Sequence, residues 1–283
     1  MHRIMAEQEI QVPIMADVAA EGKTIDVLFW VGCAGSFDDR AQRITRDFIK
    51  ILHACEVNYA VLGPEESCTG DPAKRAGNEF LFQMQAMQNI EVLNSYEIKR
   101  IVTACPHCFN TIKNEYPQLG GEYEVMHHSQ FLNELLASGK MAVQGGSFKG
   151  RKVAYHDSCY LGRANEVYEA PRQVIEQMDA DLVELKRCRQ NGLCCGAGGA
   201  QMFKDPEKTY ADKQRTQAAE QDYDVNVERT KDVLEAKPDY VAVACPFCMT
   251  MMSDGVKYAE KQDSIKVLDL AEFVARANGL TKD

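Results

Sequence analysis

Nine of the eleven cysteines in this chain form one pattern that occurs twice. The soft sulfur of a cysteine thiolate is the ligand that iron–sulfur clusters and structural zinc ions require. Two sets of thiols in matching order therefore predict two metal centres, one in each half of the chain. The first set is Cys33, Cys68, Cys105 and Cys108, and the second set is Cys159, Cys194, Cys195, Cys245 and Cys248.

The spacing between equivalent cysteines indicates an internal duplication. Cys159 follows Cys33 by 126 positions (33 to 159). Cys194 follows Cys68 by the same 126 positions (68 to 194). The two Cys-Pro-x-Cys pairs are shifted by 140 positions instead (105 to 245), and a 14-residue insertion in the second half accounts for the difference (140 less 126).

The tripeptide Cys194-Cys195-Gly196 distinguishes between the two kinds of metal. Neighbouring side chains diverge, so two adjacent thiolates reach one zinc ion at about 2.3 Å only with strain. A cluster of several irons offers a separate iron to each thiolate. Gly196 allows backbone conformations closed to other residues and lets the chain approach the inorganic core. These features favour an iron–sulfur cluster over zinc for the five cysteines of the second half.

The first half departs from this pattern at Thr69, which stands where the 126-position shift predicts a second adjacent cysteine (195 to 69). Four cysteines remain in that half. Four thiolates suit a cubane [4Fe–4S] cluster, and they suit a tetrahedral zinc ion equally. The sequence leaves both alternatives open, with the cluster preferred.

Two further cysteines and two histidines lie near the pattern. Cys55 falls at an apolar position of a predicted helix and Cys188 has no counterpart in the first half, so we expect packing or surface thiols. His156 precedes a ligand, where it either donates a hydrogen bond to cluster sulfur or is satisfied at a strand end. His107 corresponds to Phe247 in the other half, so we expect no chemical role that the two halves share.

The segments around the cysteines alternate between apolar, β-rich runs and amphipathic stretches. This order predicts an α/β fold in which parallel strands are joined by crossover helices. Loops beyond the carboxyl ends of parallel strands gather at one edge of the sheet, where ligands bind, so each half should assemble its thiols there. The predicted strands are residues 25–33, 57–62, 100–104, 124–126, 152–156, 181–185, 240–244 and 265–268. The predicted helices are residues 38–55, 78–93, 108–116, 131–136, 167–178, 226–234, 249–260 and 271–277.

The 283 residues are enough for two domains, and the duplication predicts two pseudo-repeated domains, each a small parallel sheet flanked by helices. Residues 1–24 lack a clear period and are expected to form an N-terminal arm. We expect residues 25–143 to form the first cysteine-rich domain, with the incomplete motif, and residues 144–283 to form the second, with the complete motif. The insertion falls in the polar segment 204–224, which is typical of a solvated loop or short helix.

Composition limits the classes of partner. The 32 basic and 42 acidic residues give a net charge of −10, which disfavours a nucleic-acid partner that needs a basic face. No apolar run reaches the roughly 18–20 residues of a membrane span. Free cysteines in Cys-Pro-x-Cys spacing without a secretory signal predict a reducing cytosol. A partner protein could still hold the chain at the inner face of a membrane.

Several motifs together resemble a known family. The order Cys, Cys-Cys-Gly and Cys-Pro-x-Cys, with the run from His156 to Arg163 and the run from Leu193 to Gly199, is similar to the cysteine-rich CCG domain of heterodisulfide reductase. Relatives in that family include iron–sulfur subunits of glycolate and lactate oxidation systems. The run from Glu66 to Glu79 resembles the branch that accompanies electron-transferring flavoprotein and acyl-CoA oxidation. The resemblance covers residues 25–277 and implies a non-cubane [4Fe–4S] cluster on the five second-half cysteines.

The sequence contains neither a glycine fingerprint for a dinucleotide nor a ferredoxin-type cysteine run. We therefore expect an iron–sulfur oxidoreductase or electron-transfer subunit, because a cluster performs one-electron chemistry and a partner must supply the flavin. The donor would be a flavoprotein, such as electron-transferring flavoprotein. An alternative partner is a quinone-reducing membrane protein. The acceptor would be a quinone or a thiol–disulfide couple. Two alternatives remain: disulfide cleavage at the non-cubane cluster, as the resemblance implies, and a scaffold protein stabilised by zinc.

Overall fold

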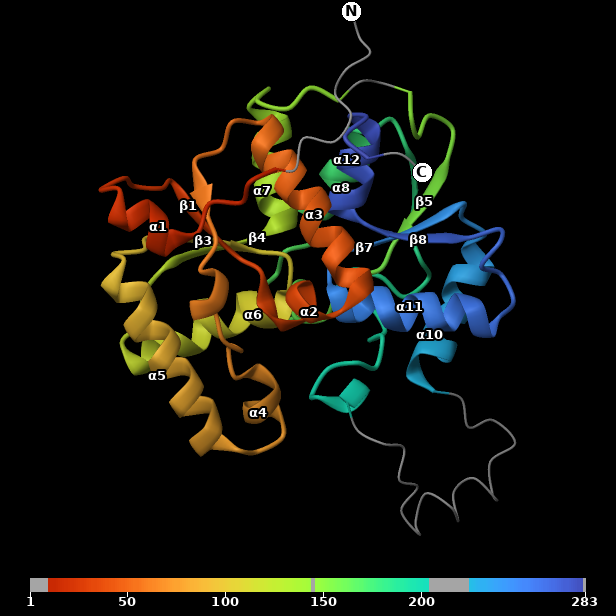
Figure 1. Cartoon of the computed structure of the whole chain (residues 1–283). Coiled ribbons are helices and arrows are strands. Elements are labelled where there is room, and N and C mark those ends of the chain that lie inside the picture. Colours follow the sequence, from red (N-terminus) through yellow and green to blue (C-terminus); the bar gives the residue numbers. More distant parts are fainter. Residues whose placement is uncertain (1–9, 144–145, 204–223, 282–283) are drawn as a thin grey trace, which may run out of the picture.

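Two four-stranded parallel sheets, one from each half of the chain, form the framework of the molecule (Figure 1). The computed structural model describes residues 10–143, 146–203 and 224–281. The strand orders, β2-β1-β3-β4 and β6-β5-β7-β8, are identical after a shift of four strands, which confirms the predicted α/β repeat. The strands are β1 (Val27–Trp30), β2 (Tyr59–Ala60), β3 (Arg100–Thr103), β4 (Glu124–His127), β5 (Lys152–Tyr155), β6 (Asp181–Val183), β7 (Tyr240–Val243) and β8 (Lys266–Asp269).

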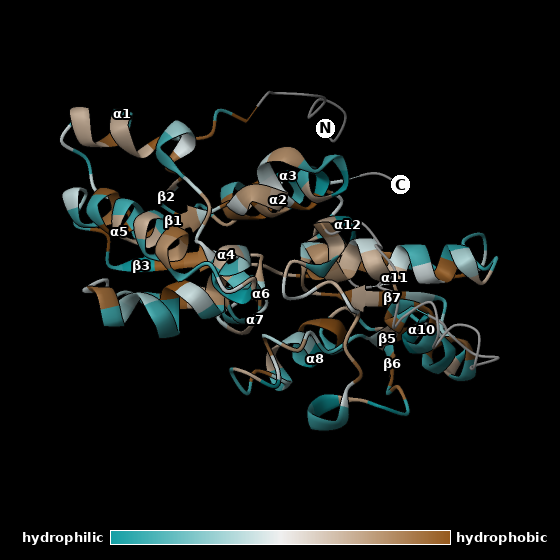
Figure 2. Ribbon diagram, turned by 90° about the horizontal axis from the view of Figure 1, so that it is seen from below, coloured by the Kyte–Doolittle hydropathy of each residue, from teal (hydrophilic) through white to brown (hydrophobic). Residues whose placement is uncertain are grey.

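Helices cover both faces of each sheet, so the central strands β1, β3, β5 and β7 are buried over most of their length. All four residues of β1 are buried, as a parallel strand covered on both faces requires. Figure 2 shows the two sheets side by side, with hydrophobic strands between helices that turn hydrophilic sides outward. The helices are α1 (Met15–Ala20), α2 (Gly32–Phe37), α3 (Asp39–Ala54), α4 (Asp71–Arg75), α5 (Glu79–Ser95), α6 (Pro106–Asn110), α7 (His128–Ala137), α8 (Glu169–Glu176), α10 (Val225–Ala236), α11 (Pro246–Tyr258) and α12 (Leu270–Ala277).

Short 3₁₀ and π turns complete the connections. They lie at Gly63–Glu65, Thr111–Glu115, Tyr116–Leu119, Arg189–Asn191 and Gln201–Phe203. Side-chain caps fix the starts of the longer helices: the Asp38 carboxylate accepts the backbone N–H of Ala41 before α3, and Asp269 and Glu272 form a capping box at α12.

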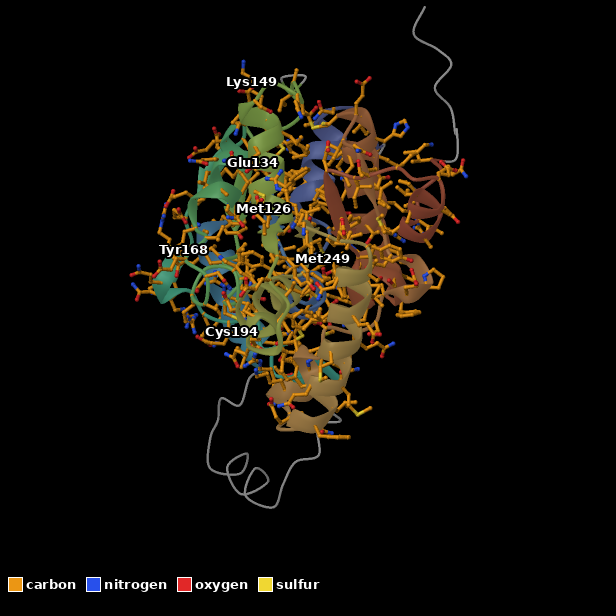
Figure 3. All side chains as sticks on the ribbon, turned by 90° about the vertical axis from the view of Figure 1, so that its left-hand side faces the viewer. Met126, Glu134, Lys149, Tyr168, Cys194 and Met249 are labelled. Atoms are coloured by element: carbon orange, nitrogen blue, oxygen red, sulfur yellow. The ribbon has the colours of Figure 1, made fainter. Side chains whose placement is uncertain are left out.

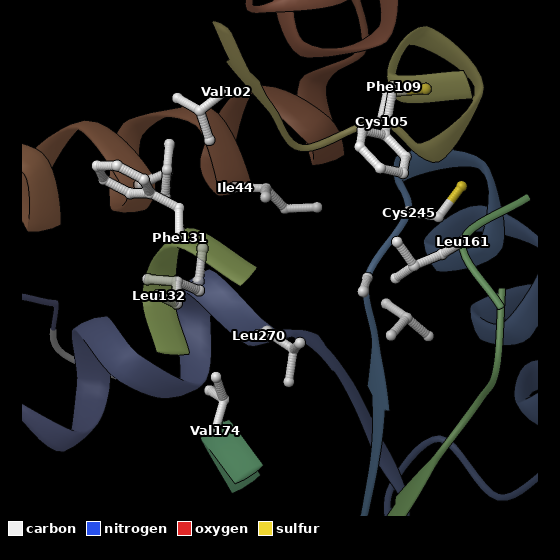
Figure 4. Close-up of a cluster of buried hydrophobic side chains, with 14 of the residues drawn as sticks. Ile44, Val102, Cys105, Phe109, Phe131, Leu132, Leu161, Val174, Cys245 and Leu270 are labelled. Atoms are coloured by element: carbon white, nitrogen blue, oxygen red, sulfur yellow. The ribbon is translucent and has the colours of Figure 1, made fainter. Parts of the chain in front are cut away.

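The two halves share one continuous core. Helix α3 of the first half packs against α11 and α12 of the second half. Figure 4 shows Ile44 of α3 and Leu270 of α12 in the same buried cluster. Polar contacts fix the orientation: the Arg40 guanidinium donates to both carboxylate oxygens of Glu272, at 2.8 and 2.7 Å. Because these contacts are part-buried and directional, the two sheet edges are held in one relative position.

Some elements differ from the sequence prediction. A helix, α1, lies in the predicted arm, where Ile14 pairs with Val61 of the first half and Met15 is buried. The helix predicted at residues 108–116 is a short α-helix followed by a π turn. Most of the polar segment 204–224 lies outside the described residues. Among the described helices, none combines the length and apolar character that a membrane crossing needs.

Candidate metal centres

The loops that follow the strands carry the predicted ligands. Cys33 follows β1, and Cys105 follows β3 at the start of α6. In the second half Cys159 follows β5, and Cys245 follows β7 at the start of α11. Figure 1 shows α2, α6 and α11 along the same lower side of the two sheets, and Figure 3 shows Cys194 at that end of the molecule. The structure therefore confirms that the cysteines gather at the carboxyl ends of the strands.

The five second-half thiols are linked by contacts from each sulfur atom to the next. The sulfur atoms of Cys159 and Cys194 are 3.9 Å apart, and those of Cys195 and Cys248 are 3.4 Å apart. Side-chain hydrogen bonds also join Cys194 to Cys195, and Cys245 to Cys248. The five sulfur atoms thus form one linked group, which is the arrangement that one cluster with several irons needs.

The Cys-Cys-Gly turn has a backbone that only glycine adopts without strain. Gly196 has φ of +91°, and a Cβ there would lie 3.0 Å from the Cβ of Val225. Its N–H donates to Cys194 Sγ at 3.3 Å. The first half repeats this geometry, because Gly70 has φ of +89° and donates its N–H to Cys68 Sγ at 3.5 Å. The predicted role of Gly196, an unusual backbone beside the sulfur atoms, agrees with this geometry.

His156 is fully buried beside the second-half thiols. Its Nδ1 accepts a hydrogen bond from Arg229 Nε at 3.1 Å, while Nε2 is buried and has no partner among the described residues. Burial, followed by the charge of Arg229, lowers the pKa of His156 to about 3. The ring is therefore neutral and carries its proton on Nε2. One ring nitrogen lies within 4.8 Å of the sulfur atoms of Cys195 and Cys248, so an N–H without a partner fits a hydrogen bond to cluster sulfur.

The first-half thiols form a second group, of four. Side-chain hydrogen bonds join Cys33 to Cys68, and Cys105 to Cys108. All four line one small cavity. Thr69 occupies the place that Cys195 has in the second half, and its hydroxyl lies 3.8 Å from Cys108 Sγ. The first group therefore offers four thiolates and one hydroxyl where the second offers five thiolates.

Crowding of the thiols makes each group suited to a cation. A hydrogen bond from Cys33 lowers the pKa of Cys68 to about 6, and one from Cys159 lowers the pKa of Cys194 to about 2. Hydrogen bonds with neighbouring thiols, followed by burial, raise the pKa of Cys108 and of Cys248 well above the ordinary value. The thiols of one group cannot all ionise together without positive charge between them, and a bound metal supplies that charge.

Carboxylates that the sequence analysis did not single out hold the ligand loops. Glu66 accepts the backbone N–H groups of Val31 and Gly32 at 3.0 and 2.6 Å, and burial raises its pKa to about 7. In the second half the buried Asp157 pairs with Arg172. Each of the two acids lies two positions before a proposed ligand in the sequence (66 to 68 and 157 to 159), and that proximity was the available signal.

The two remaining cysteines and a buried histidine lie outside the two groups. Cys55 is buried at the end of α3, where burial raises its pKa, and Cys188 contacts Glu184 instead of another thiol. His127 is fully buried and accepts the backbone N–H of Ser129 at the start of α7. These contacts are structural, in agreement with the sequence-based interpretation of the two cysteines.

His107 lies between the two groups. Its Nδ1 is 3.0 Å from Asp71 Oδ2. Although burial opposes the change, that hydrogen bond and the charges of Cys105 and Cys245 raise the pKa of His107 to about 9. The ring also packs against Phe247, its counterpart in the repeat. The sequence predicted no shared role for the two residues, and the structure places them in contact.

A hollow of about 320 Å³ opens beside Cys33. Apolar side chains from both halves line most of it, and Phe37 and Phe203 at its mouth are largely exposed. A partner molecule can therefore come close to the first group of thiols from this side.

Two parallel sheets with matching thiol groups define a duplicated cysteine-rich α/β protein. The CCG family model, described as a cysteine-rich domain, matches residues 27–113 and 153–253, one stretch in each half. The chain belongs to the CCG cysteine-rich domain family, which confirms the resemblance seen in the sequence.

Relatives carry names that refer to iron–sulfur and redox proteins. EtfAB:quinone oxidoreductase of Syntrophomonas wolfei is 42% identical over 257 residues, which is 91% of this chain and 35% of the relative. The probable iron–sulfur-binding oxidoreductase FadF of Bacillus subtilis is 40% identical over 270 residues, 95% of this chain and 36% of the relative. A component of the dihydromethanophenazine:CoB–CoM heterodisulfide reductase of Methanosarcina barkeri is 33% identical over 272 residues, 94% of this chain and 62% of the relative. The chain spans about a third of the length of the first two relatives.

Proposed function

We propose that this chain is the cysteine-ligated electron-transfer module of an iron–sulfur oxidoreductase. The observation that carries the proposal is the linked group of five thiols at one sheet edge, with sulfur pairs at 3.9 and 3.4 Å. A [4Fe–4S] cluster, non-cubane in form, supplies one-electron chemistry when bound there. The proposed ligands are Cys159, Cys194, Cys195, Cys245 and Cys248.

The first-half thiols are proposed to hold a second [4Fe–4S] cluster, with zinc as the alternative metal. The ligands would be Cys33, Cys68, Cys105 and Cys108. The four-thiol set supports a cubane, because it supplies one thiolate for each iron. The same set fits a tetrahedral zinc ion, so metal content decides between them.

The surrounding residues orient the ligands and tune the potential. His156 has a ring nitrogen within 4.8 Å of the sulfur atoms of Cys195 and Cys248, and its unpartnered Nε2 proton would donate to cluster sulfur. Gly196 directs a backbone N–H to Cys194. Hydrogen bonds to sulfur stabilise the more negative, reduced state. Met249, which follows the last ligand and is fully buried, keeps water away from this side. Burial favours the state of lower charge, so the two effects act in opposite directions on the potential.

We propose a flavoprotein, such as electron-transferring flavoprotein, as the donor and a quinone or a thiol–disulfide couple as the acceptor. The printed names of two relatives refer to EtfAB, quinone and heterodisulfide, which supports this choice. Partner contact near Cys33 would use the apolar hollow beside it. The proposed location is the cytosol, with a membrane-bound quinone-reducing protein as the partner that would bring the chain to the inner face of a membrane.

The test is electron transfer in the protein purified without air. The loaded protein should be reduced by a reduced flavoprotein and reoxidised by a soluble quinone, with cluster absorbance reporting both steps. Cys195→Ser should reduce this exchange, while Cys55→Ser, at a buried thiol outside both groups, should leave it unchanged. A loaded protein that neither accepts nor releases electrons would contradict the proposal, and a preparation with zinc and no iron would support the scaffold alternative.

A second candidate activity is cleavage of a disulfide at the second-half centre. The observation that favours it is the 33% identity to a component of a heterodisulfide reductase together with the complete group of five thiols. Thr69 argues against a version that needs two such centres. Adding disulfides to the reduced protein separates the candidates: cleavage releases free thiols as the centre is reoxidised, whereas an electron relay releases none.

A further inference from the structure

His107 is enclosed by residues of the other half. The residue is 5% exposed. The ring stacks on Tyr160, with ring centres 4.2 Å apart and planes at 30°, and it meets the edge of Phe247 at 5.4 Å and 73°. A first-half imidazole is therefore held against two second-half aromatic rings, a contact that the repeat alone does not predict.

Each residue in this contact belongs to a loop that carries proposed ligands. His107 lies inside the first Cys-Pro-x-Cys pair and Phe247 inside the second. Tyr160 directly follows Cys159. A Cβ placed on Gly198, in the loop after the Cys-Cys-Gly turn, would lie 3.5 Å from His107 Cε1. One ring thus contacts two loops of the second centre and lies beside a third, while it is part of the first.

The orientation of the ring is fixed by a buried carboxylate. Asp71, itself 3% exposed, lies 3.0 Å from His107 Nδ1, and Arg75 Nε donates to the same carboxylate at 3.1 Å. The Arg75 guanidinium also lies 5.7 Å from the centre of the Tyr160 ring. Because these groups hold one another, the imidazole cannot turn without breaking a buried hydrogen bond.

Thiolates of both halves lie near this ring. The charges of Cys105 and Cys245 both act on His107. Figure 4 shows these two cysteines at the same end of the buried cluster, next to Phe109 and Leu161. The contact between His107 and the second-half rings therefore provides a packed route from one thiol group to the other.

We propose that His107 is a positioning residue that couples the two metal centres, and that its stacked contact with Tyr160 is the route by which single electrons pass between them. The inference rests on the proposed function, because it requires a redox-active centre in each half. Each transfer oxidises one centre by one electron and reduces the other by one electron, without bond formation or cleavage. Electron tunnelling weakens steeply with distance and with gaps in packing, so removal of the ring should slow it.

The experiment uses the full chain, loaded without air and reduced with dithionite, so that no partner protein is needed. The variants are His107→Ala, which removes the ring, and Tyr160→Leu, which removes the facing ring from the other half. His107→Phe keeps a ring and loses the hydrogen bond to Asp71. His53→Ala is the control, because His53 is an exposed histidine on α3. Iron and sulfide are counted in each, and electron paramagnetic spectra are recorded with one and with both centres reduced.

Wild type and His53→Ala should show magnetic interaction between the centres and rapid redistribution of electrons after partial reduction. His107→Ala and Tyr160→Leu should retain iron, lose most of the interaction, and redistribute electrons about tenfold more slowly or worse, as expected when reacting groups lose their positioning. In His107→Phe the magnetic interaction and the rate of redistribution should lie between those of the wild type and those of His107→Ala.

The inference would be overturned if fully loaded His107→Ala and Tyr160→Leu keep the magnetic interaction between the centres and redistribute electrons as fast as the wild type. If His107→Ala loses iron, Tyr160→Leu and His107→Phe decide the question; loss of iron from all three would show a structural support and would also overturn it. Zinc in the first group would remove the second redox centre and overturn the inference, while the proposed function would survive on the second-half cluster. A chain without iron would overturn both.

Discussion

Replacement of Arg172 by methionine tests whether a buried ion pair holds the loop that carries Cys159. The Arg172 side chain is 2% exposed and donates to both oxygens of Asp157, at 2.8 and 2.9 Å. It also donates to Glu184 at 2.7 and 2.9 Å. Methionine retains most of the apolar stem, so the substitution removes the charge and its hydrogen bonds more than the packing.

The magnitude follows from the burial of the two acids. Asp157 is 5% exposed, and without Arg172 it keeps one close donor, the backbone N–H of Arg189 at 2.7 Å. Removal of one partner of a buried pair costs about 3–5 kcal/mol. The side chain of Glu184 is 39% exposed, so water replaces its partner and its loss adds only about 0–1 kcal/mol. Arg172→Met should therefore lower the free energy of unfolding by about 3–5 kcal/mol.

The assay is urea unfolding of the metal-free protein, followed by far-ultraviolet circular dichroism. The double variant Asp157→Asn/Arg172→Met should be more stable than the sum of the single effects predicts, by about 1–3 kcal/mol, because the second change removes the unpaired charge. Arg46→Met, at an exposed position of α3, is the control and should change stability by no more than about 0.5 kcal/mol. A loss below about 1 kcal/mol in Arg172→Met would refute this account of the pair, since that is the value of an exposed ion pair.

Three further predictions concern the centres themselves. Thr69→Cys restores the missing thiol beside Cys108 Sγ, which is 3.8 Å from the hydroxyl, so the spectrum of the first centre should shift toward that of the second; an unshifted spectrum would contradict the equivalence of the two sites. Cys195→Ser should alter the electron paramagnetic spectrum of the oxidised protein while Cys55→Ser should not, and equal spectra in both variants would discredit the group of five ligands. Gly196→Ala and Gly199→Ala both place a side chain on left-handed backbone at a cost of about 1–2 kcal/mol, but only the side chain at position 196 meets a neighbouring carbon at 3.0 Å. Gly196→Ala should therefore have the lower thermal midpoint and the lower iron content. Equal values in the two variants would contradict the close approach.

The duplicated cysteines were enough to predict the architecture. Cysteines that recur at a fixed shift, each after an apolar run, predict two sheets with the ligands of each at one edge. Strand order and the edge that carries the ligands both follow from the strand–helix–strand repeat. Thr69 was also visible as the missing thiol, and its structural counterpart is Cys195, as the shift required. The ligand assignments themselves stay predictions until metal is measured.

Contacts between elements far apart in the sequence could not be predicted in this way. Comparison of equivalent positions treats His107 and Phe247 as a mismatch, yet the two residues meet where the halves face each other. Arg229 was not identified because an arginine on a helix is usually solvated, whereas here it is fully buried against His156. Helix α1 was missed because residues 1–24 lack a period, and Ile14 is held by pairing with Val61, which lies far along the chain. Each of these contacts depends on how elements dock, which a repeat does not encode.

The most direct test of the central claim is the amount of iron, acid-labile sulfide and zinc per chain in protein purified without air. Five linked thiols in the second half predict at least about four iron and four sulfide per chain, and about eight of each when both groups hold clusters. About four iron with one zinc would assign zinc to the first group. Zinc alone, without iron or sulfide, would contradict the account.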